Sequence, residues 1–308
     1  MNIIFITQFY YPHMGGVEKH VRILSEKLVD KGNTVTVITT KFQPNLLSNE
    51  SISGVKVIRF IQPKIKLIGL IYTWYWVVCN LNVFKKANII HAHDVTIWLM
   101  PLKLLMPSKK IFSTMHGWEG SYPIAVKNIV LKKISRLISF KVIAIGKYIE
   151  KYYGILADKI LYGAVNLQNK AYRKQRKLIF VGRLEQDTGV GDFIKLLKSY
   201  KNYTIEFYGD GSMRSLCSKY GKVNGFVDLS NVFKNAEFVF AGGYLVALEA
   251  LSFGCKVLVA WDNPLKKDYW IDFPLYPYLL KPNESIKLLS NYSWENLIKS
   301  YNALWKLK

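Results

Sequence analysis

The sequence predicts an α/β fold built from two Rossmann-like domains that face each other across a cleft. Short apolar runs alternate with longer stretches of helical periodicity along the chain, a pattern typical of βαβ units and parallel sheets. The 308 residues are enough for two domains that each bury a core, and half of them are hydrophobic. A polar, basic stretch near residues 163–175 divides the series of strands. We therefore predict a first domain at 1–165 and a second at 166–290.

The first domain opens with a predicted strand at 3–7 and a helix at 17–31, which Gly32 ends. Further apolar runs predict strands at 34–39, 55–60, 89–91, 111–115 and 141–145. In the second domain, strands are predicted at 178–181, 204–208, 238–240 and 256–260. Helices are predicted between them at 193–200, 213–220 and 245–253. This order places the residues that follow each strand at one edge of each sheet, where open α/β sheets bind ligands.

The uncharged stretch 67–84 lies between lysines and leaves three interpretations open. They are a membrane-spanning helix, a surface helix that faces a membrane, and a core helix. A spanning helix needs about 20 predominantly apolar residues, whereas this stretch contains Thr73, Asn80 and Asn82. A core helix is the favoured interpretation.

A second amphipathic helix is predicted at 124–140. Its apolar residues are expected on one face, and Lys132, Lys133 and Arg136 on the other. An ordinary surface helix explains this pattern. Together with the stretch 67–84, it also fits a domain seated on an anionic membrane leaflet.

The formal net charge of +22 favours an anionic partner, such as phosphate groups, lipid headgroups or nucleic acid. No nucleic-acid recognition motif accompanies it, so a specific nucleic-acid partner is not expected. Three dispersed cysteines without a CxxC pair indicate reduced thiols in the cytoplasm. The apolar N-terminal run fits a first strand and lacks the marks of a signal peptide.

Gly15 and Gly16 stand between the first strand and its helix, where backbone N–H groups and the helix N-terminus suit a phosphate. A plain turn is the alternative. The pair is not a GxGxxG dinucleotide fingerprint, and no GxxxxGK[ST] phosphate loop occurs.

Histidines end two neighbouring strands of the first domain, at His91 and His93 before Asp94 and at His116. Their neutral imidazoles could hydrogen-bond a sugar hydroxyl or a leaving phosphate. A structural role and metal ligation are the alternatives. We expect no metal site, because no further carboxylate or histidine lies near them in the sequence.

Three strand or helix ends of the second domain carry candidate binding groups. Arg183 directly follows a strand, and its planar guanidinium suits a diphosphate unless it pairs with Glu185 or Asp187. The Gly209–Asp210–Gly211 turn offers backbone access to a ligand. Glu249 lies in an otherwise apolar helix, where a carboxylate is costly unless it is paired, and a ribose diol would satisfy it.

Taken together, these stretches resemble the retaining GT-B glycosyltransferases of family 4 along almost the whole chain. The matching segments in order are FYYPHMGGVEKHV, IIHAHD, TMHG, VIAIGKYIEKYYG with YGAVN, VGRLEQDTG, YGDG, LEALSFGCKVLV and SWENLIKSYNALWK. The last resembles the family's final helix, so residues 291–308 are expected to return to the first domain. Each segment alone is a weak signal, whereas the ordered set is specific.

The resemblance implies a hexosyltransferase that uses a nucleotide-diphosphate sugar, retains the anomeric configuration and needs neither metal nor cofactor. Gly15 and Gly16 would lie at the donor phosphates. His116 would contact the transferred sugar, and His93 would line the cleft. Arg183 would bind the diphosphate.

In the second domain the resemblance implies that Glu249 holds the ribose, with Gly209, Asp210 and Gly211 at the donor. Two residues depart from the family pattern. Thr188 stands where the family usually has a lysine, and Ala241 stands where it has a glutamate eight residues before the ribose-binding one.

Gly243 and Tyr244 are expected to reshape the donor site next to Ala241, and Lys266 or Lys267 to restore the positive charge. The two departures leave open a catalytically impaired nucleotide-sugar-binding or scaffold protein. The acceptor is expected to be lipid-linked, a glycan or a protein. The protein is expected in the cytoplasm, including the inner face of the membrane, and its oligomeric state is left open.

Overall fold

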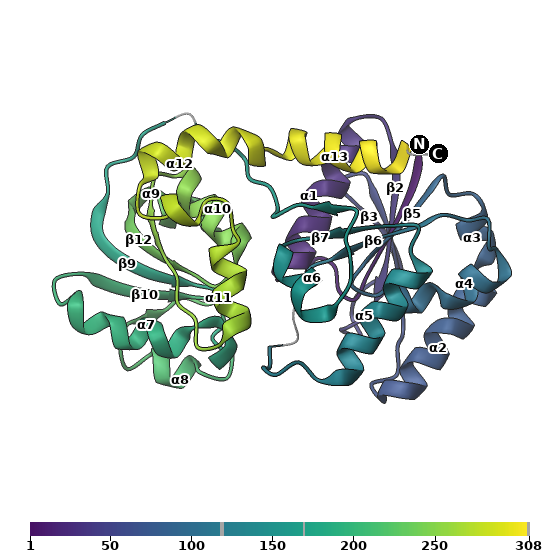
Figure 1. Cartoon of the computed structure of the whole chain (residues 1–308), viewed down its shortest axis with the longest axis horizontal. Coiled ribbons are helices and arrows are strands. Elements are labelled where there is room, and N and C mark those ends of the chain that lie inside the picture. The colour runs from purple at the N-terminus through teal and green to yellow at the C-terminus, as the bar shows by residue number, and fades with distance from the viewer. Residues whose placement is uncertain (118–119, 169, 307–308) are drawn as a thin grey trace.

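The computed structural model describes residues 1–117, 120–168 and 170–306 and contains two α/β domains (Figure 1). The predicted fold class is confirmed. The first sheet has eight strands and the second has five, and each domain places helices on both faces of its sheet.

All strands of the first sheet pair in parallel except β3, an edge strand antiparallel to β4. Across the sheet the order is β3 (Asn49–Ile52), β4 (Val55–Phe60), β2 (Thr34–Thr40), β1 (Asn2–Thr7), β5 (Ile89–His93), β6 (Ile111–Met115), β7 (Lys141–Ala144) and β8 (Lys159–Ile160). Its helices are α1 (Gly16–Asp30), α2 (Lys66–Cys79), α3 (Leu81–Lys85), α4 (Met100–Leu105), α5 (Val126–Ile138) and α6 (Lys147–Tyr153). Alternate residues of β1 serve opposite faces. Phe5 packs with α1, and Ile4 packs on the side of α2 and α4.

The second sheet is parallel throughout. Its order is β11 (Lys222–Val223), β10 (Thr204–Tyr208), β9 (Gln175–Val181), β12 (Ala236–Ala241) and β13 (Lys256–Leu258). Its helices are α7 (Val190–Leu196), α8 (Arg214–Cys217), α9 (Ser230–Asn235), α10 (Tyr244–Ser252), α11 (Pro264–Ile271) and α12 (Pro282–Leu288). The predicted central strands are present. The short edge strands β3, β8 and β11 were not predicted because they lack apolar runs.

Helix α13 (Trp294–Lys306) starts beside the second domain and packs on the first, as the yellow helix in Figure 1 shows. Its buried residues, including Trp294, Tyr301 and Trp305, join one core with β1 and α1. A second apolar cluster crosses between the domains and contains Tyr148 of α6 together with Tyr269 of α11. The two domains therefore share a continuous apolar contact.

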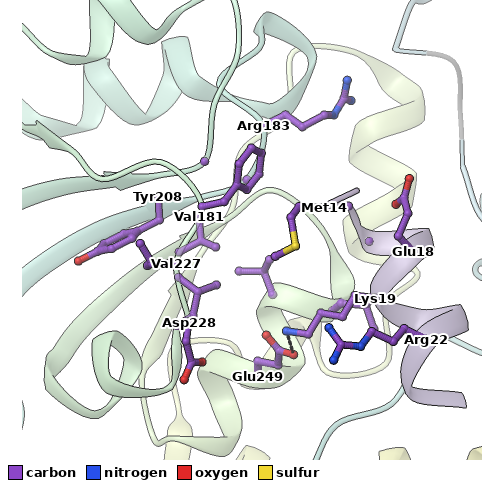
Figure 2. A pocket seen from close by; sticks show the side chains of 18 of the residues that line it. Met14, Glu18, Lys19, Arg22, Val181, Arg183, Tyr208, Val227, Asp228 and Glu249 are labelled. Atoms are coloured by element: carbon purple, nitrogen blue, oxygen red, sulfur yellow. Dashed lines mark ion pairs between the residues drawn. The ribbon is translucent and has the colours of Figure 1, made fainter. Parts of the chain in front are cut away.

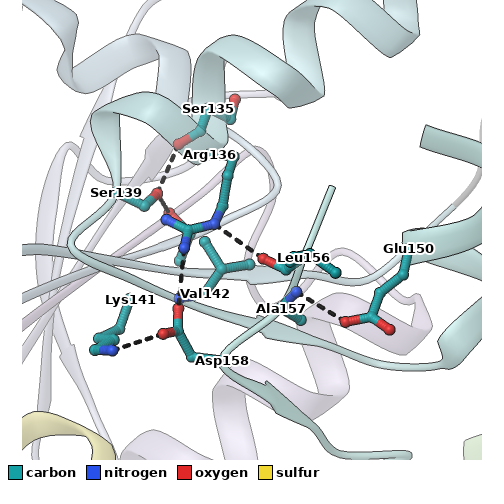
Figure 3. Close-up of polar contacts among 10 residues, drawn as sticks. Ser135, Arg136, Ser139, Lys141, Val142, Glu150, Leu156, Ala157 and Asp158 are labelled. Carbon is teal, nitrogen blue, oxygen red and sulfur yellow. Dashed lines mark hydrogen bonds and ion pairs between the residues drawn. The ribbon is translucent and has the colours of Figure 1, made fainter. Parts of the chain in front are cut away.

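The last strands of the first sheet are fixed by a polar cluster (Figure 3). The carboxylate of Asp158 accepts hydrogen bonds from Lys141 Nζ at 2.7 Å and from the Val142 N–H at 2.9 Å. Arg136 of α5 donates to the Leu156 carbonyl at 2.9 Å. These contacts bind α5 and the chain before β8 to the edge of the sheet.

The stretch 67–84 forms two surface helices, so its favoured interpretation as a core helix is wrong. Helix α2 ends at Cys79, and α3 begins at Leu81. Thr73 and Val77 are buried, whereas six apolar side chains of α2 are 40–69% exposed: Leu67, Ile68, Ile71, Tyr72, Tyr75 and Val78. No helix in the described part of the chain is long and apolar enough to cross a membrane.

The predicted faces of helix α5 are also wrong. Leu137 is 82% exposed, whereas the Lys132 side chain points inward and forms an ion pair with Asp94 at 3.4 Å. The ammonium of Lys132 also lies 5.0 Å from the ring centre of Tyr153. A long lysine can bury its alkyl chain while its charge is compensated, so a buried lysine breaks the simple apolar pattern.

Candidate functional site

A cavity of about 550 Å³ lies between the two domains. It is bounded by the N-terminal part of α1, the carboxyl ends of β9 and β10, the chain at 225–229 and helix α10. Five of the predicted site residues line it: Gly15, Gly16, Arg183, Gly209 and Glu249. In Figure 2, Lys19 reaches toward Glu249, and Met14 lies between this pair and Arg183. The cavity lies where α/β folds bind ligands, at the carboxyl ends of parallel strands.

The glycine turn at the start of α1 is closely packed against other groups. A Cβ atom at Gly15 would clash with the carboxylate of Glu18, which pairs with Nδ1 of His13 at 2.9 Å. A carboxylate therefore lies at the helix N-terminus, where the helix dipole favours negative charge. A Cβ at Gly16 would lie 3.9 Å from Leu245 of α10, so this turn touches the second domain.

Arg183 extends from the end of β9, and its side chain is largely exposed. Its Nη2 pairs with Oδ2 of Asp187 at 2.7 Å, which was one of the predicted alternatives. Thr188 donates its hydroxyl to the carbonyls of Arg183 and Glu185, at 2.6 and 2.7 Å. Because Thr188 closes this turn, its side chain does not supply a ligand-binding group in this structure.

A second positive group, Lys266 of α11, lies near Arg183 and is only 7% exposed. Burial lowers the pKa of Lys266 to about 8, partly offset by the negative charge of Asp187. Its ammonium lies 4.8 Å from the ring centre of Tyr269. Two cations therefore share the neighbourhood of Asp187, which gives this end of the second sheet a positive character.

Glu249 forms an ion pair with Lys19 of α1 at 2.5 Å. The pair joins the two domains across the cavity (Figure 2). The sequence had predicted that this carboxylate needs a partner, but not that Lys19 is close to it. A ligand that uses Glu249 must compete with Lys19.

The histidines form a buried cluster beside the cavity. Nδ1 of His93 and Nε2 of His116 are joined by a hydrogen bond of 2.8 Å. Asp94 accepts a hydrogen bond from the His116 main-chain N–H at 2.9 Å, which fixes the end of β6. His20 of α1 packs edge-on against His116, with ring centres 4.9 Å apart. The residues that line the cavity within the described chain do not include His93 or His116.

Burial keeps these imidazoles neutral. It lowers the pKa of His116 to about 3, and the positive charge of Lys132 adds to this effect. Burial also holds the pKa values of His20 and His93 well below their usual range. Nε2 of His93 is buried and has no hydrogen-bond partner among the described residues.

Three of these imidazoles could offer nitrogen ligands to a metal. The candidate atoms of His20, His93 and His116 lie within 4.8 Å of one another. This arrangement was not predicted, because His20 belongs to helix α1 and precedes the other two histidines by more than 70 residues in the sequence. The hydrogen bond between His93 and His116 already explains why two of these rings lie close together.

Tyr244 lies in the core between the domains and not at the cavity. Its ring stacks on Tyr269 at 3.9 Å, and its main-chain N–H donates to the Tyr269 hydroxyl at 3.0 Å. Gly243 directly precedes α10 as its N-cap. Neither Gly243 nor Tyr244 lines the cavity, so the structure does not bring these two predicted residues to the other candidates.

The residues of the turn after β10 do not all lie at the cavity. A Cβ atom at position 209 would clash with the Gly182 carbonyl. The φ of 136° at Gly209 also favours glycine, so only a glycine permits this close approach of the two strands. Asp210 pairs with Arg214 at 3.2 Å and accepts from the Gly211 N–H at 2.9 Å. Asp210 and Gly211 are not among the residues that line the cavity.

Several cavity residues were not predicted as site residues. They come from α1 and from the chain after β11, and they include Lys19, Arg22, Phe226, Val227 and Asp228. The segment NGFVDLS, an Asn-Gly turn signal followed by two apolar residues, was the available signal for the last three. Phe226 is 55% exposed, which gives the cavity an aromatic wall.

Comparisons with known proteins concern the sequence and the fold. A sequence model of Glycosyltransferase Family 4 matches residues 14–160. The GPI3 subunit of phosphatidylinositol N-acetylglucosaminyltransferase from Saccharomyces cerevisiae is 28% identical over 95 residues, which cover 30% of this chain and 21% of that relative. An uncharacterised glycosyltransferase of Methanocaldococcus jannaschii is 24% identical, with 100% of this chain and 98% of the relative covered.

Among solved structures, sucrose-phosphate synthase from Thermosynechococcus elongatus aligns with a TM-score of 0.74 at 15% identity. The alignment covers 99% of this chain and 98% of that chain. At this identity the likeness shows a common fold.

Proposed function

Because residues 14–160 belong to glycosyltransferase family 4 and the whole chain has the GT-B fold, we propose that this protein is a hexosyltransferase. It takes a sugar from a nucleoside diphosphate sugar and transfers it to a lipid-linked acceptor. The reaction retains the anomeric configuration and uses no metal ion. A glycan or protein acceptor is the alternative to a lipid-linked one.

The observation that carries this proposal is the cavity between the domains, with Arg183 and Glu249 on one side and the glycine turn of α1 on the other. A guanidinium matches the geometry of a diphosphate, and a carboxylate matches the diol of a ribose. The aromatic wall at Phe226 suits a nucleobase, which stacks on exposed rings. These three groups fit the three parts of a nucleotide sugar.

Fixed positive charge is the main catalytic contribution in this proposal. When the bond between the sugar and the diphosphate breaks, negative charge develops on the leaving phosphate. Arg183 stabilises this charge, and removal of one such donor costs roughly 3–4 kcal/mol in comparable oxyanion sites. Attack within a tight ion pair on the same face needs no carboxylate nucleophile.

His116 is proposed to contact the transferred sugar. The sugar must then extend past the first turn of α1 toward the end of β6. Gly120, four residues after His116, lies near the second domain, because a Cβ atom there would be 3.1 Å from Oδ2 of Asp187. Since Asp187 pairs with Arg183, this contact supports a sugar position between His116 and the diphosphate.

An anionic membrane surface is proposed as the partner of the first domain. The exposed apolar side chains of α2 lie beside α4, where Leu104 and Leu105 are also exposed. Figure 1 shows both helices on the side of the first domain that faces away from the second. Scattered exposed apolar residues are common, but an apolar face of this size on one helix marks a binding surface. The positive net charge favours anionic lipid.

The second candidate function is donor binding without turnover. It is favoured by Thr188, whose side chain serves the turn, and by Ala241, which is 2% exposed and has no polar group. Neither residue supplies the donor-directed group that the family resemblance implies at its position.

The test of donor binding and reaction is a thermal-shift screen with UDP-, GDP- and ADP-sugars, followed by separate measurements of donor hydrolysis and transfer. A hexosyltransferase is stabilised by one donor and transfers its sugar. Donor binding with neither reaction would favour the scaffold alternative. No stabilisation by any of these nucleotide sugars would remove the proposed donor class.

Membrane binding is tested by co-sedimentation with vesicles of phosphatidylcholine alone or with phosphatidylglycerol. The protein is expected in the pellet only with the anionic vesicles. Ile71→Gln combined with Tyr75→Gln should release it, because both side chains are exposed on α2. Leu280→Gln is the control, since Leu280 is similarly exposed but belongs to the second domain. Equal binding of all three proteins would contradict the proposed surface.

A further inference from the structure

Helix α13 reaches the histidine cluster through a group that can only donate a hydrogen bond. Nε1 of Trp305 donates to Nδ1 of His91 at 3.0 Å. An indole N–H has no acceptor capacity, so Nδ1 of His91 must carry a lone pair. Burial holds the pKa of His91 well below its usual range, so this imidazole is neutral. Its single proton is therefore on Nε2.

The position of that proton sets the direction of the next hydrogen bond. Nε2 of His91 donates to the hydroxyl of Thr114, 2.8 Å away. The proton of Thr114 is then left for another acceptor, and the hydroxyl of Tyr301 lies 2.9 Å away. The Tyr301 hydroxyl in turn lies 3.2 Å from Nε2 of His20. A hydroxyl has one proton and can accept two hydrogen bonds, so the arrangement that gives every proton of this series an acceptor runs from Trp305 through Thr114 and Tyr301 to His20.

The last hydrogen bond of this series determines the tautomer of His20. In this arrangement its Nε2 accepts a hydrogen bond from Tyr301, and burial keeps the ring neutral, so its own proton is on Nδ1. The tautomer of a histidine is commonly set by the hydrogen bond that its other nitrogen makes. Here that bond comes from Tyr301 of helix α13, which lies 281 residues after His20 in the sequence.

His20 connects this chain to the candidate site in two ways. Its ring packs edge-on against His116, with centres 4.9 Å apart. It also belongs to the second turn of α1, directly after Lys19, which lines the cavity. The other titratable or charged groups near this pair include His91, His93, Lys132 and Asp94, together with Tyr301 itself. A change at His20 is therefore transmitted to His116 and to the donor-facing end of α1.

We propose that Tyr301 is a positioning residue, which fixes His20 in the Nδ1-protonated tautomer and thereby orients the His116 ring for sugar transfer. The N–H of Trp305 sets the direction in which this series of hydrogen bonds begins. The catalytic part of this role rests on the proposed function, whereas the tautomer assignment does not. Helix α13 thus contributes to the active site without contacting the substrate.

The first test is ¹⁵N NMR of histidine-labelled protein without donor, which distinguishes the protonated ring nitrogen of each imidazole. His91 is expected with its proton on Nε2 and His20 with its proton on Nδ1. The opposite tautomer at either residue would overturn the assignment, because the chain would then run in another direction.

The second test uses Tyr301→Phe, which removes the hydroxyl and keeps the ring. The His20 tautomer should become mixed, and the signals of His116 should shift. Turnover should fall about fivefold, the order expected for one lost hydrogen bond, while the donor KM is retained. A merely structural role would lower the melting temperature without changing the His116 signals.

Tyr203→Phe is the matched control, because its hydroxyl also makes a hydrogen bond, to Glu237 at 3.0 Å in the second domain. It should leave the histidine signals and turnover unchanged. Unshifted His116 signals in Tyr301→Phe would overturn the positioning role. Wild-type turnover with an altered His20 tautomer would overturn its link to catalysis. A wild-type protein without any transfer activity would instead contradict the proposed function, and the NMR results would still decide the positioning role.

Discussion

Replacement of Glu249 by glutamine tests the proposed ribose contact with little change in shape. The variant keeps a hydrogen-bonding side chain of the same length and removes its negative charge. Hydrogen bonds to a charged group contribute roughly 1.5–3 kcal/mol. Before it can bind the ribose, the Glu249 carboxylate must give up its ion pair with Lys19. The Glu249 side chain is 20% exposed, and the Lys19 side chain is 45% exposed. An ion pair of this exposure contributes about 0–1 kcal/mol.

The difference between these contributions is about 0.5–3 kcal/mol, which corresponds to a roughly 2- to 160-fold weaker Kd for the nucleoside diphosphate. Isothermal titration calorimetry with the nucleotide selected by the thermal-shift screen measures this change. The melting temperature of the free protein should change little, because the Lys19 pair is partly exposed.

The matched control is Glu26→Gln. Glu26 also lines the cavity, and it pairs with Arg22 at 2.9 Å. Its replacement removes the same charge from the same cavity and should leave the Kd within about twofold, in the range of a neutral surface change. Equal affinity of wild type and Glu249→Gln would refute the ribose contact. Equal losses in both variants would show that only the total charge matters.

Arg183→Ala should weaken nucleoside diphosphate binding by roughly 1.5–3 kcal/mol, measured by calorimetry, and an unchanged Kd would remove Arg183 from the site. His116→Ala should lower turnover more than nucleotide affinity in steady-state assays, and wild-type turnover would contradict its proposed role. Incubation with EDTA should leave transfer unchanged if no metal takes part, whereas activity that is lost and then restored by a divalent metal would identify a metal-dependent reaction. For Asp158, burial opposes ionisation, but bonds from Lys141 and Val142 outweigh it and hold its pKa below the ordinary 3.8. Its stabilising contribution is therefore present above that pH and lost as the pH falls through the lowered value. Asp158→Asn should lower the melting temperature at pH 7, and this difference should shrink below pH 3.8; an equal difference at both pH values would contradict this contribution.

The central strands could be predicted because they are buried on both faces. A strand buried on both faces, such as β1, needs apolar residues on both faces, and its sequence shows this as the uninterrupted apolar run from Ile3 to Ile6. Edge strands such as β8 have two residues and little apolar surface to bury, so the local pattern does not mark them.

The candidate site could be predicted where its residues follow strands or stand out in the local sequence, as the Gly15–Gly16 pair and Glu249 in its apolar helix do. Arg183 and Gly209 line the cavity because the topology brings strand ends together. His20 and Lys19 reach the site from a helix face, and their partners lie far along the chain. Tyr244 was predicted at the site because it lies near Ala241 in the sequence, but its ring packs into the contact between the domains. The orientation of such a side chain depends on tertiary packing, which the local sequence pattern does not reveal.

The path of the chain also determines the order in which the protein can fold during synthesis. Trp294, Tyr301 and Trp305 complete the core that contains β1 and α1, yet the ribosome makes them after all of the second domain. Domains generally fold as units, N-terminal first, during translation. Here the first domain is synthesised early, but the apolar surface that α13 covers stays exposed until α13 is made. Nascent chains stalled before residue 294 are therefore expected to be protease-sensitive and dependent on chaperones.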